Sequence, residues 1–332
     1  MKKNVFRAIS ILMTAVLLLS CVSLFGCGKK KKEIVIYTSS EDFQIEYMQA
    51  RFEEQFPNLK IVLEYKSSGD HAAQLMSEGT KSACHISHDI EYGYAEQLAK
   101  AGVYADLKDI LDFSVYAEDA VDSTFYAPEV RNGGAIILNM DVINEKGLKE
   151  PTSYADLLDP QYKDLISMPN PKASGTGYMF LLSLVNAMGE EAALSYFDQL
   201  SENVLSFTSS GSGPVNALVG KEVAIGLGMT AHAVQEIAAG ENLKIVYFNE
   251  GSPFSLYGQA IVAGNETDSD VVEVFKFLAT TLTEEKCQRF YPEKIYKDKS
   301  FTIENYPTDI PYANMSNNTP ERKVELLDKW NH

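Results

Sequence analysis

Short β-rich segments of this chain are repeatedly followed by a loop of serine, threonine and glycine and then by a segment with helical periodicity. The first unit has a strand at Ile34–Tyr37, a polar turn at residues 38–40 and four apolar residues at helical spacing between 45 and 56. Pro57 and Asn58 break that helix, and residues 59–65 have the composition of the next strand. This order of strand, helix and strand predicts an α/β fold.

The same alternation is predicted for most of the remaining chain, without internal repeats or low-complexity blocks. Helices are expected over residues 72–79, 94–101, 152–158, 179–188, 214–219, 231–239 and 270–281. Strands are expected over residues 88–91, 133–139, 204–207, 223–229, 243–248 and 259–262.

Four Ser/Thr/Gly clusters stand where a strand or loop leads into a helix: residues 37–41, 67–70, 174–178 and 209–214. Ligands of open α/β sheets bind beyond the carboxyl ends of the strands, where helix N-termini offer unpaired N–H groups and positive partial charge. Such termini suit carboxylate, phosphate or phosphonate oxygens. Each cluster alone is more typical of helix capping than of ligand binding. Two clusters in each half of the chain favour two lobes that face a shared cleft.

The first 26 residues have the pattern of a secretory signal. A basic head with Lys2, Lys3 and Arg7 precedes an uncharged apolar run over residues 8–20. Residues 24–27, Leu-Phe-Gly-Cys, resemble the bacterial lipobox, in which the cysteine thiol receives a diacylglycerol. The sequence therefore predicts a signal peptide over 1–26, lipidation of Cys27 and a basic tether over 27–32 on the outer face of the membrane. An uncleaved anchor and a cut at Cys21 are the alternatives.

Charge and cysteine content narrow the class of protein further. The net charge is −17, and removal of residues 1–26 would make it −20, which argues against nucleic acid as a partner. After that removal Cys84 and Cys287 remain beside Cys27, and two lone core thiols are expected rather than a disulfide. The length of the mature chain suits two lobes, and no second membrane span is predicted after Cys27.

Several segments, in order along the chain, carry a resemblance to a known family: residues 151–160, 168–171, 174–178, 209–214, 220–226, 305–310 and 321–323. In these segments the chain resembles ABC-transporter solute-binding proteins of the type II periplasmic class, in the branch of ferric-ion, 2-aminoethylphosphonate and sugar-phosphate binders. The resemblance implies a two-lobed α/β fold with mixed sheets flanked by helices and a ligand cleft at the hinge. It implies a first lobe over 33–135 plus 262–332 and a second over 136–261, with strands crossing near 134–139 and 257–262.

The resemblance also implies a monomeric receptor without a cofactor that delivers a small solute to permease subunits. Ferric-ion members resemble one another in adjacent tyrosines after the strand that corresponds to residues 223–229, where this chain has Met229-Thr230-Ala231-His232. A phosphonate or sugar phosphate is therefore expected, and ferric ion is the alternative. The predicted ligand-binding residues are Thr38, Ser39, Ser40, Ser68, Gly69, Glu91, Tyr92, Ser174, Gly175, Thr176, Gly177, Ser210, Gly211, Ser212, Gly213, Thr230, His232 and Tyr257.

Other kinds of site have weaker support in the sequence. Cys84, His85, His88 and Asp89 could form a metal site, but His85 and His88 point to opposite faces of an extended segment. Ser212 and His232 could act as nucleophile and base, but no orienting acid and no hydrolase, zinc-protease or nucleotide-binding motif accompanies them. Neither an enzyme nor a structural adhesin is therefore favoured, and no metal is expected.

Overall fold

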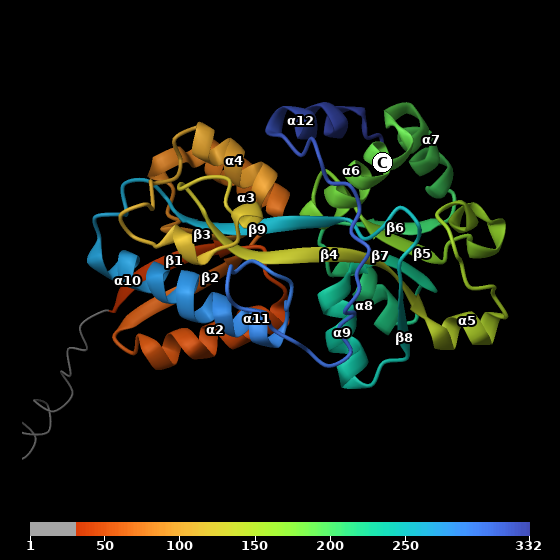
Figure 1. The fold of residues 1–332 in the computed structure, drawn as a ribbon, viewed down its shortest axis with the longest axis horizontal. Helices are drawn as coiled ribbons and strands as arrows, with labels where there is room; N and C mark the ends of the chain where they lie inside the picture. Colours follow the sequence, from red (N-terminus) through yellow and green to blue (C-terminus); the bar gives the residue numbers. More distant parts are fainter. Residues whose placement is uncertain (1–30) are drawn as a thin grey trace, which may run out of the picture.

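The structure, a computed structural model, describes residues 31–332 and contains two α/β lobes connected by one mixed sheet (Figure 1). The strand order is β2-β1-β3-β9-β4-β7-β5-β6, and β8 pairs with β4. The predicted signal peptide and Cys27 lie outside the described residues. No helix among residues 31–332 is long and apolar enough to cross a bilayer.

The first lobe contains three parallel strands, so the polar residues that follow them meet at one edge of the sheet. The strands are β1 (Lys32–Thr38), β2 (Leu59–Tyr65) and β3 (Ile86–Glu91), with β1 in the middle. The helices of this lobe are α2 (Asp42–Gln55), α3 (Ser68–Glu78), α4 (Tyr92–Lys100), α10 (Ser269–Phe277) and α11 (Thr283–Arg289). A π-helical turn at Leu278–Leu282 joins the last two.

The second lobe repeats this plan with β5, β6 and β7 in parallel. Its strands are β5 (Ile166–Pro169), β6 (Val204–Thr208), β7 (Ile225–Met229) and β8 (Leu243–Val246). Its helices are α5 (Met140–Lys146), α6 (Gly175–Met188), α7 (Glu190–Leu200), α8 (Gly213–Val219) and α9 (Thr230–Ala239). Short 3₁₀ turns lie at Ala155–Leu158 and Pro160–Tyr162 in this lobe, and at Gly79–Lys81, Phe113–Val115 and Glu118–Ala120 in the first.

Two long strands, β4 (Ala127–Asn139) and β9 (Phe254–Ile261), connect the lobes (Figure 1). The β4 strand pairs with β9 as far as Gly133 and with β7 from Gly134 onward, so it changes partner at this glycine pair. A Cβ atom on Gly134 would lie 2.9 Å from Met179 and Phe180 side-chain atoms, which explains the glycine by close packing. The lobe boundaries at 135/136 and 261/262 stay predictions.

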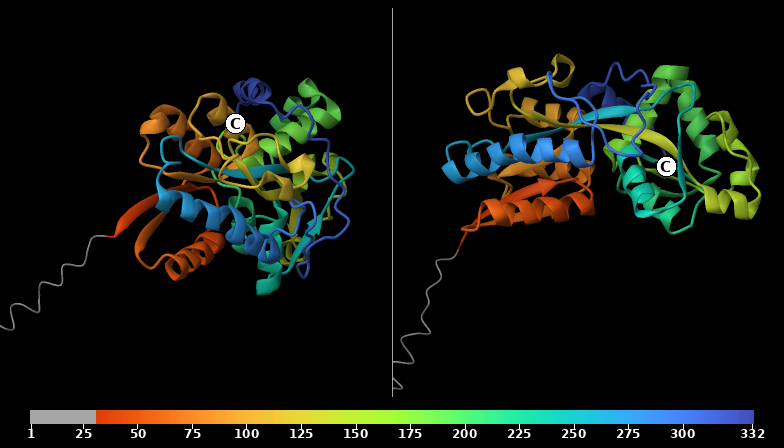
Figure 2. Two further views of the ribbon diagram at one scale, coloured as in Figure 1. Left: turned by 60° about the vertical axis from the view of Figure 1, so that its left-hand side comes forward. Right: turned by 60° about the horizontal axis from the view of Figure 1, so that its bottom comes forward.

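The helix α12 (Pro320–Lys329) contacts both lobes, and both views of Figure 2 show it between α4 and the helices α6 and α7. Trp330, 1% exposed, packs in the second-lobe core with ring centroids 5.2 Å from Phe197 and 5.7 Å from Phe207. A separate cluster of apolar residues around Phe52, Ile86 and Phe275 forms a core of the first lobe.

Most predicted elements are confirmed, with changes at their ends. The helix α6 begins at Gly175 rather than 179, and residues 152–158 contain a short 3₁₀ turn instead of a full helix. The helices α5, α7, α11 and α12 and the strand β5 were not predicted. Cys84 and Cys287 are confirmed as free, buried thiols.

Candidate functional site

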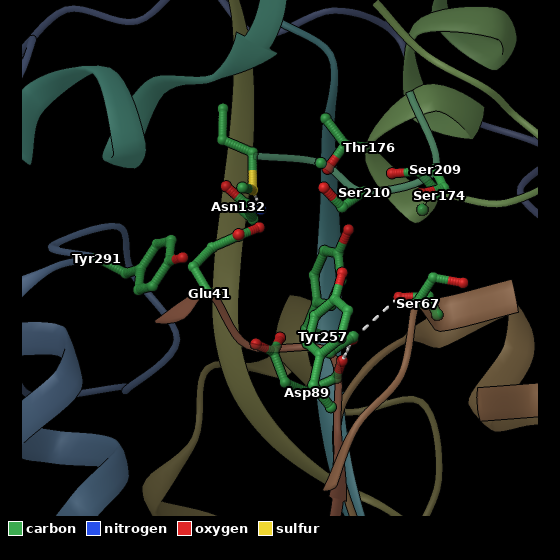
Figure 3. A pocket seen from close by; sticks show the side chains of 16 residues that line it. Glu41, Ser67, Asp89, Asn132, Ser174, Thr176, Ser209, Ser210, Tyr257 and Tyr291 are labelled. Carbon is green, nitrogen blue, oxygen red and sulfur yellow. Dashed lines mark hydrogen bonds between the residues drawn. The ribbon is translucent and has the colours of Figure 1, made fainter. Parts of the chain in front are cut away.

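A narrow cavity lies between the lobes at the carboxyl ends of the parallel strands (Figure 3). Its volume of about 30 Å³ is close to the space that one water molecule occupies in the liquid. The lining residues are Ser39, Glu41, Tyr65, Ser67, Ser68, Asp89, Asn132, Ser174, Gly175, Thr176, Ser209, Ser210, Gly211, Met229, Tyr257 and Tyr291. Hydroxyl groups therefore dominate the wall.

The second-lobe wall of the cavity is the start of α6 together with the loop after β6. Ser174 caps α6 by accepting a hydrogen bond from the Gly177 N–H at 3.5 Å. Gly175 has no space for a side chain, because a Cβ atom there would lie 2.8 Å from the Tyr257 hydroxyl oxygen. The backbone of this first helical turn is therefore close to the cavity, with the positive end of the helix dipole directed toward it.

The first-lobe wall begins with residues that follow β1 and β2. The Ser39 and Ser68 hydroxyls are hydrogen-bonded at 3.0 Å, which brings the loop after β1 against the start of α3. Ser67 caps α3 by accepting from the Asp70 N–H. Two of the four predicted clusters thus meet here, as the parallel strand order requires.

Two carboxylates, Glu41 and Asp89, also belong to this wall (Figure 3). The pKa of Glu41 is raised to about 7, chiefly because burial opposes the charged form; a hydrogen bond from Ser212 and the charge of His232 lower it, and the charge of Asp89 raises it. Burial also raises the pKa of Asp89, whose carboxylate accepts a hydrogen bond from the Ser40 hydroxyl at 2.6 Å. None of the described residues that line the cavity is Lys, Arg or His. The cavity is therefore acidic on its first-lobe side.

Asp89 sits above a buried network of charged and polar groups. His88 contacts the Thr38 hydroxyl at 2.9 Å and the Glu129 carboxylate at 3.0 Å, and Lys286 donates to the same carboxylate. Burial by itself would raise the pKa of Glu129, but His88 and Lys286 lower it to about 2. The buried charged groups next to Asp89 are therefore paired with one another.

The pKa of Glu41 predicts how stability depends on pH. The folded, ligand-free protein holds a proton on Glu41 between pH 4.5 and about 7, where the unfolded chain has lost it. The free energy of unfolding should therefore fall as pH rises through this window, by up to about 3 kcal/mol from Glu41. Denaturant unfolding from pH 5 to 8 should show a smaller fall in Glu41→Gln, and equal slopes would contradict the raised pKa.

The two lobes contact each other directly around the cavity. The Gly69 N–H donates to the Ala173 carbonyl at 3.3 Å, and the rings of Phe43 and His232 lie 5.8 Å apart. On the same side, Gln235 donates to the Arg289 carbonyl at 3.4 Å. The structure is therefore a closed form, and a solute larger than water requires the lobes to separate before it enters.

Eight of the predicted ligand-binding residues line the cavity: Ser39, Ser68, Ser174, Gly175, Thr176, Ser210, Gly211 and Tyr257. Ten others do not line it: Thr38, Ser40, Gly69, Glu91, Tyr92, Gly177, Ser212, Gly213, Thr230 and His232.

Physical reasons keep several of these ten residues away from the cavity. Thr38 is bonded to His88 and Ser40 to Asp89. The hydroxyls of Ser212 and Ser210 are hydrogen-bonded at 2.8 Å, and the Thr230 hydroxyl lies 3.3 Å from that of Tyr247.

The glycines among them pack against neighbouring chain. Gly69 lies against the backbone of residues 172–173, Gly177 against the Pro169 carbonyl and Gly213 against the Thr208 side chain. His232, 5% exposed, faces Phe43 and Glu236.

Glu91 and Tyr92 differ most from their predicted place at the cleft. Glu91 is fully buried, where it pairs with Lys323 and accepts from Ser255 at 2.8 Å and from Asn318 at 3.1 Å. Tyr92 donates to the Ala120 carbonyl at 2.7 Å. Both side chains are engaged inside the first lobe and against α12.

The prediction omitted eight lining residues: Glu41, Tyr65, Ser67, Asp89, Asn132, Ser209, Met229 and Tyr291. Glu41, Ser67 and Ser209 belong to the polar clusters that the sequence showed, so position next to a cluster was the available signal. Asn132 and Tyr291 come from distant parts of the chain and carried no local signal.

Residues 91–301 of the chain match one family model, which is described as bacterial extracellular solute-binding protein. The chain belongs to this family. Solute-binding proteins of the family bind small molecules and deliver them to ABC permeases; they are not enzymes.

 The match over residues 91–301 spans more than half of the chain, from the end of β3 to the segment after α11. It therefore includes the second lobe and both strands that connect the lobes.

Two proteins are similar to this chain in sequence. A Haemophilus influenzae protein is 27% identical over 98% of this chain and 97% of its own length. The spermidine/putrescine-binding periplasmic protein of Salmonella typhimurium is 26% identical over 47% of this chain and 45% of its own length.

Two solved structures show the same fold. The periplasmic binding protein AfuA from Actinobacillus pleuropneumoniae, with fructose-6-phosphate bound, has a TM-score of 0.79 at 19% identity and covers 91% of this chain and 98% of its own. Iron-bound HitA from Pseudomonas aeruginosa has a TM-score of 0.72 at 16% identity and covers 91% and 100%. The predicted two-lobed, type II periplasmic-binding-protein fold is confirmed.

Proposed function

We propose that this solute-binding protein captures a small organophosphorus solute, a phosphonate or a phosphate ester, between its lobes for an ABC importer. We also propose that lipid on Cys27 holds it at the outer face of the membrane, with residues 27–32 as a tether and the soluble body acting as a monomer. The anchor follows from the sequence pattern at residues 24–27.

The observation that carries the proposed ligand class is the second-lobe wall of the cavity. Ser174, Gly175 and Thr176 at the start of α6 line the same cavity as Ser209, Ser210 and Gly211. Backbone N–H groups and hydroxyls of this kind bind phosphate oxygens without a lysine or arginine, because the donors and the helix dipole supply the positive potential. The phosphate ester named with AfuA is of the proposed class.

Ferric ion is the second candidate, and three phenols favour it. Tyr65, Tyr257 and Tyr291 line the cavity together with the two carboxylates, and all are hard oxygen donors. Burial, however, raises the pKa of Tyr65 to about 12 and raises the pKa of Tyr257 and Tyr291 well above 10, which opposes the phenolate form. We therefore favour the organophosphorus ligand.

The double variant Thr176→Val with Ser210→Ala tests the role of the second-lobe wall. It removes two hydroxyls and should weaken binding of a phosphonate or sugar phosphate about 10- to 100-fold, because each hydroxyl can donate to a charged oxygen. The measurement is isothermal titration calorimetry, with ligands chosen by thermal shift from a panel of phosphorylated solutes and Fe³⁺.

A matched control is Ser195→Ala with Thr280→Val, two exposed hydroxyl residues away from the cavity, which should leave binding unchanged. A thermal shift with Fe³⁺ and none with any phosphorylated solute would contradict the proposed ligand class. Equal affinity of the double variant and the original protein would mean that these hydroxyls only cap and pack.

A further inference from the structure

The two strands that flank β9 in the sheet each contain a β-bulge, and the bulges lie at the same level of β9. The β3 strand has two residues, His88 and Asp89, where β9 has only Gln259. On the other side, β4 has one extra residue, Glu129, directly before the residue that pairs with Tyr257. Bulges are frequent next to functional sites, where they change the direction of a side chain. Asp89 and Tyr257 line the cavity, so both bulges lie next to it.

Residues of the two bulges meet in one buried network of four side chains. His88 lies 2.9 Å from the Thr38 hydroxyl and 3.0 Å from the Glu129 carboxylate, and Lys286 donates to the same carboxylate oxygen. All four residues are 0% exposed. They belong to β1, β3, β4 and α11, so the network joins four elements of the first-lobe side of the molecule.

Each of these four elements, or the turn directly after it, also supplies a residue to the cavity wall. The pairs of network residue and lining residue are Thr38 and Ser39, His88 and Asp89, Glu129 and Asn132, and Lys286 and Tyr291. The last pair is joined through the backbone as well, because the Lys286 carbonyl accepts from the Tyr291 N–H at 3.1 Å. A change in the network therefore affects several lining residues at once.

Asp89 depends most on this support. Its backbone φ of +54° is in the left-handed region, which residues other than glycine rarely adopt. Such a conformation persists only where the surrounding structure holds it. The Ser39 hydroxyl donates to the Asp89 carbonyl, and the Asp89 carboxylate accepts from the Ser40 hydroxyl at 2.6 Å. His88, which directly precedes Asp89, is fixed by the network.

We propose that His88, Glu129 and Lys286 are positioning residues of the solute site. None of them lines the cavity. They hold Asp89 in its left-handed conformation and keep the first-lobe wall in the geometry that binds the solute. This inference rests on the proposed function only in placing the solute in this cavity, and it is independent of the ligand class. A network with a purely structural role would contribute to stability alone.

A double variant separates positioning from stability. Lys286→Met leaves Glu129 buried without its cation and should lower both the melting temperature and the affinity for the solute. Adding Glu129→Gln removes the unpaired charge, so the melting temperature should recover most of the loss. The affinity should stay lower by about tenfold or more, an effect typical of residues that support metal ligands. The measurement is titration calorimetry with methylphosphonate, fructose 6-phosphate and Fe³⁺ as probes.

Thr38 allows a milder test in which a conservative variant restores binding. Thr38→Val keeps the shape but removes the hydroxyl, so His88 and the Ser40 N–H each lose a partner. The affinity should fall about threefold to tenfold. Thr38→Ser keeps the hydroxyl and should retain the affinity of the original protein.

Tyr104→Phe is the matched control for Thr38→Val. It removes another buried hydroxyl of the first lobe, which lies 2.7 Å from the Ser87 hydroxyl on β3 but belongs neither to the network nor to the cavity wall. It should lower the melting temperature by a similar amount and leave the affinity unchanged. If the double variant does not fold, Thr38→Val and this control decide the result.

Crystal structures of the ligand-free variants give a readout that needs no solute. In the double variant and in Thr38→Val, Asp89 should leave the left-handed region or lose its hydrogen bond from Ser40. In Tyr104→Phe it should keep both.

The outcomes separate this inference from the proposed function. Recovery of the affinity together with the melting temperature in the double variant would overturn the positioning role, and so would an Asp89 that keeps its geometry in both variants. Binding of Fe³⁺ alone would overturn the proposed ligand class, and the Fe³⁺ affinities of the same variants would then test the positioning role. If no probe binds, the geometry of Asp89 decides.

Discussion

Lys323→Met is expected to lower the free energy of unfolding by about 3–5 kcal/mol. Lys323 and Glu91 are both fully buried and form an ion pair. The ammonium group also lies 3.5 Å from the ring centre of Tyr94 and 4.3 Å from that of Tyr178. Burial opposes the charge on Glu91, but Lys323 holds the pKa of this carboxyl below its usual value. Without the ammonium group a buried carboxylate has no counter-charge.

Urea unfolding of Lys323→Met measures this loss, and two further variants show its origin. Adding Glu91→Gln to Lys323→Met should restore part of the stability, because the second change removes the unpaired charge. Lys329→Met is the control on the same helix: Lys329 pairs with Glu190 and Glu325 at the surface and should contribute less than about 1 kcal/mol. Equal effects of the two lysine variants would contradict the argument.

Gly177→Ala is expected to lower the free energy of unfolding by about 3 kcal/mol and to impair ligand binding. A Cβ atom on Gly177 would lie 2.5 Å from the Pro169 carbonyl oxygen and 2.8 Å from backbone atoms of residues 170 and 171. Backbone atoms cannot move aside as a flexible side chain can. The start of α6 would therefore have to shift away from β5, together with the hydroxyls that line the cavity.

Gly220→Ala is the matched control for this substitution. Gly220 has φ −67°, and the nearest atom to a Cβ atom there would be 3.4 Å away, which is ordinary contact. Alanine should change stability by less than about 1 kcal/mol at this position. Urea unfolding and calorimetry with the strongest phosphorylated ligand measure both effects. A Gly177→Ala protein as stable as Gly220→Ala would show that the loop before α6 adapts without cost.

The sequence was sufficient to predict the alternation of strands and helices. It also predicted that the Ser/Thr/Gly clusters lie together at the cleft between the lobes. These features depend on local composition and on parallel strand order, which places the carboxyl ends of β1 and β2 at one edge. Ser39, Ser68, Ser174 and Thr176 accordingly lie on the cavity wall as predicted.

The choice between Glu91 and Asp89 could not be predicted, because it depends on an irregularity in β3. The pairing of β3 with β9 shifts between Ser87 and Ile90, and Asp89 has a φ of +54°. A β-bulge of this kind changes the direction of a side chain, so a regular alternation assigns the wrong acid to the cavity. The partner of Glu91 was equally hidden, because Lys323 follows it by more than 200 residues.

The helix α12 also affects how far the two lobes can separate. Its residues contact the first lobe through the Lys323–Glu91 pair and the second through the Arg322–Glu190 pair at 2.7 Å, and Trp330 follows in the second-lobe core. Besides β4 and β9, the lobes thus have a third mechanical link, and opening must either bend it or break a buried ion pair. We therefore expect this link to limit how widely the hinge opens, and with it the size of solute that can enter.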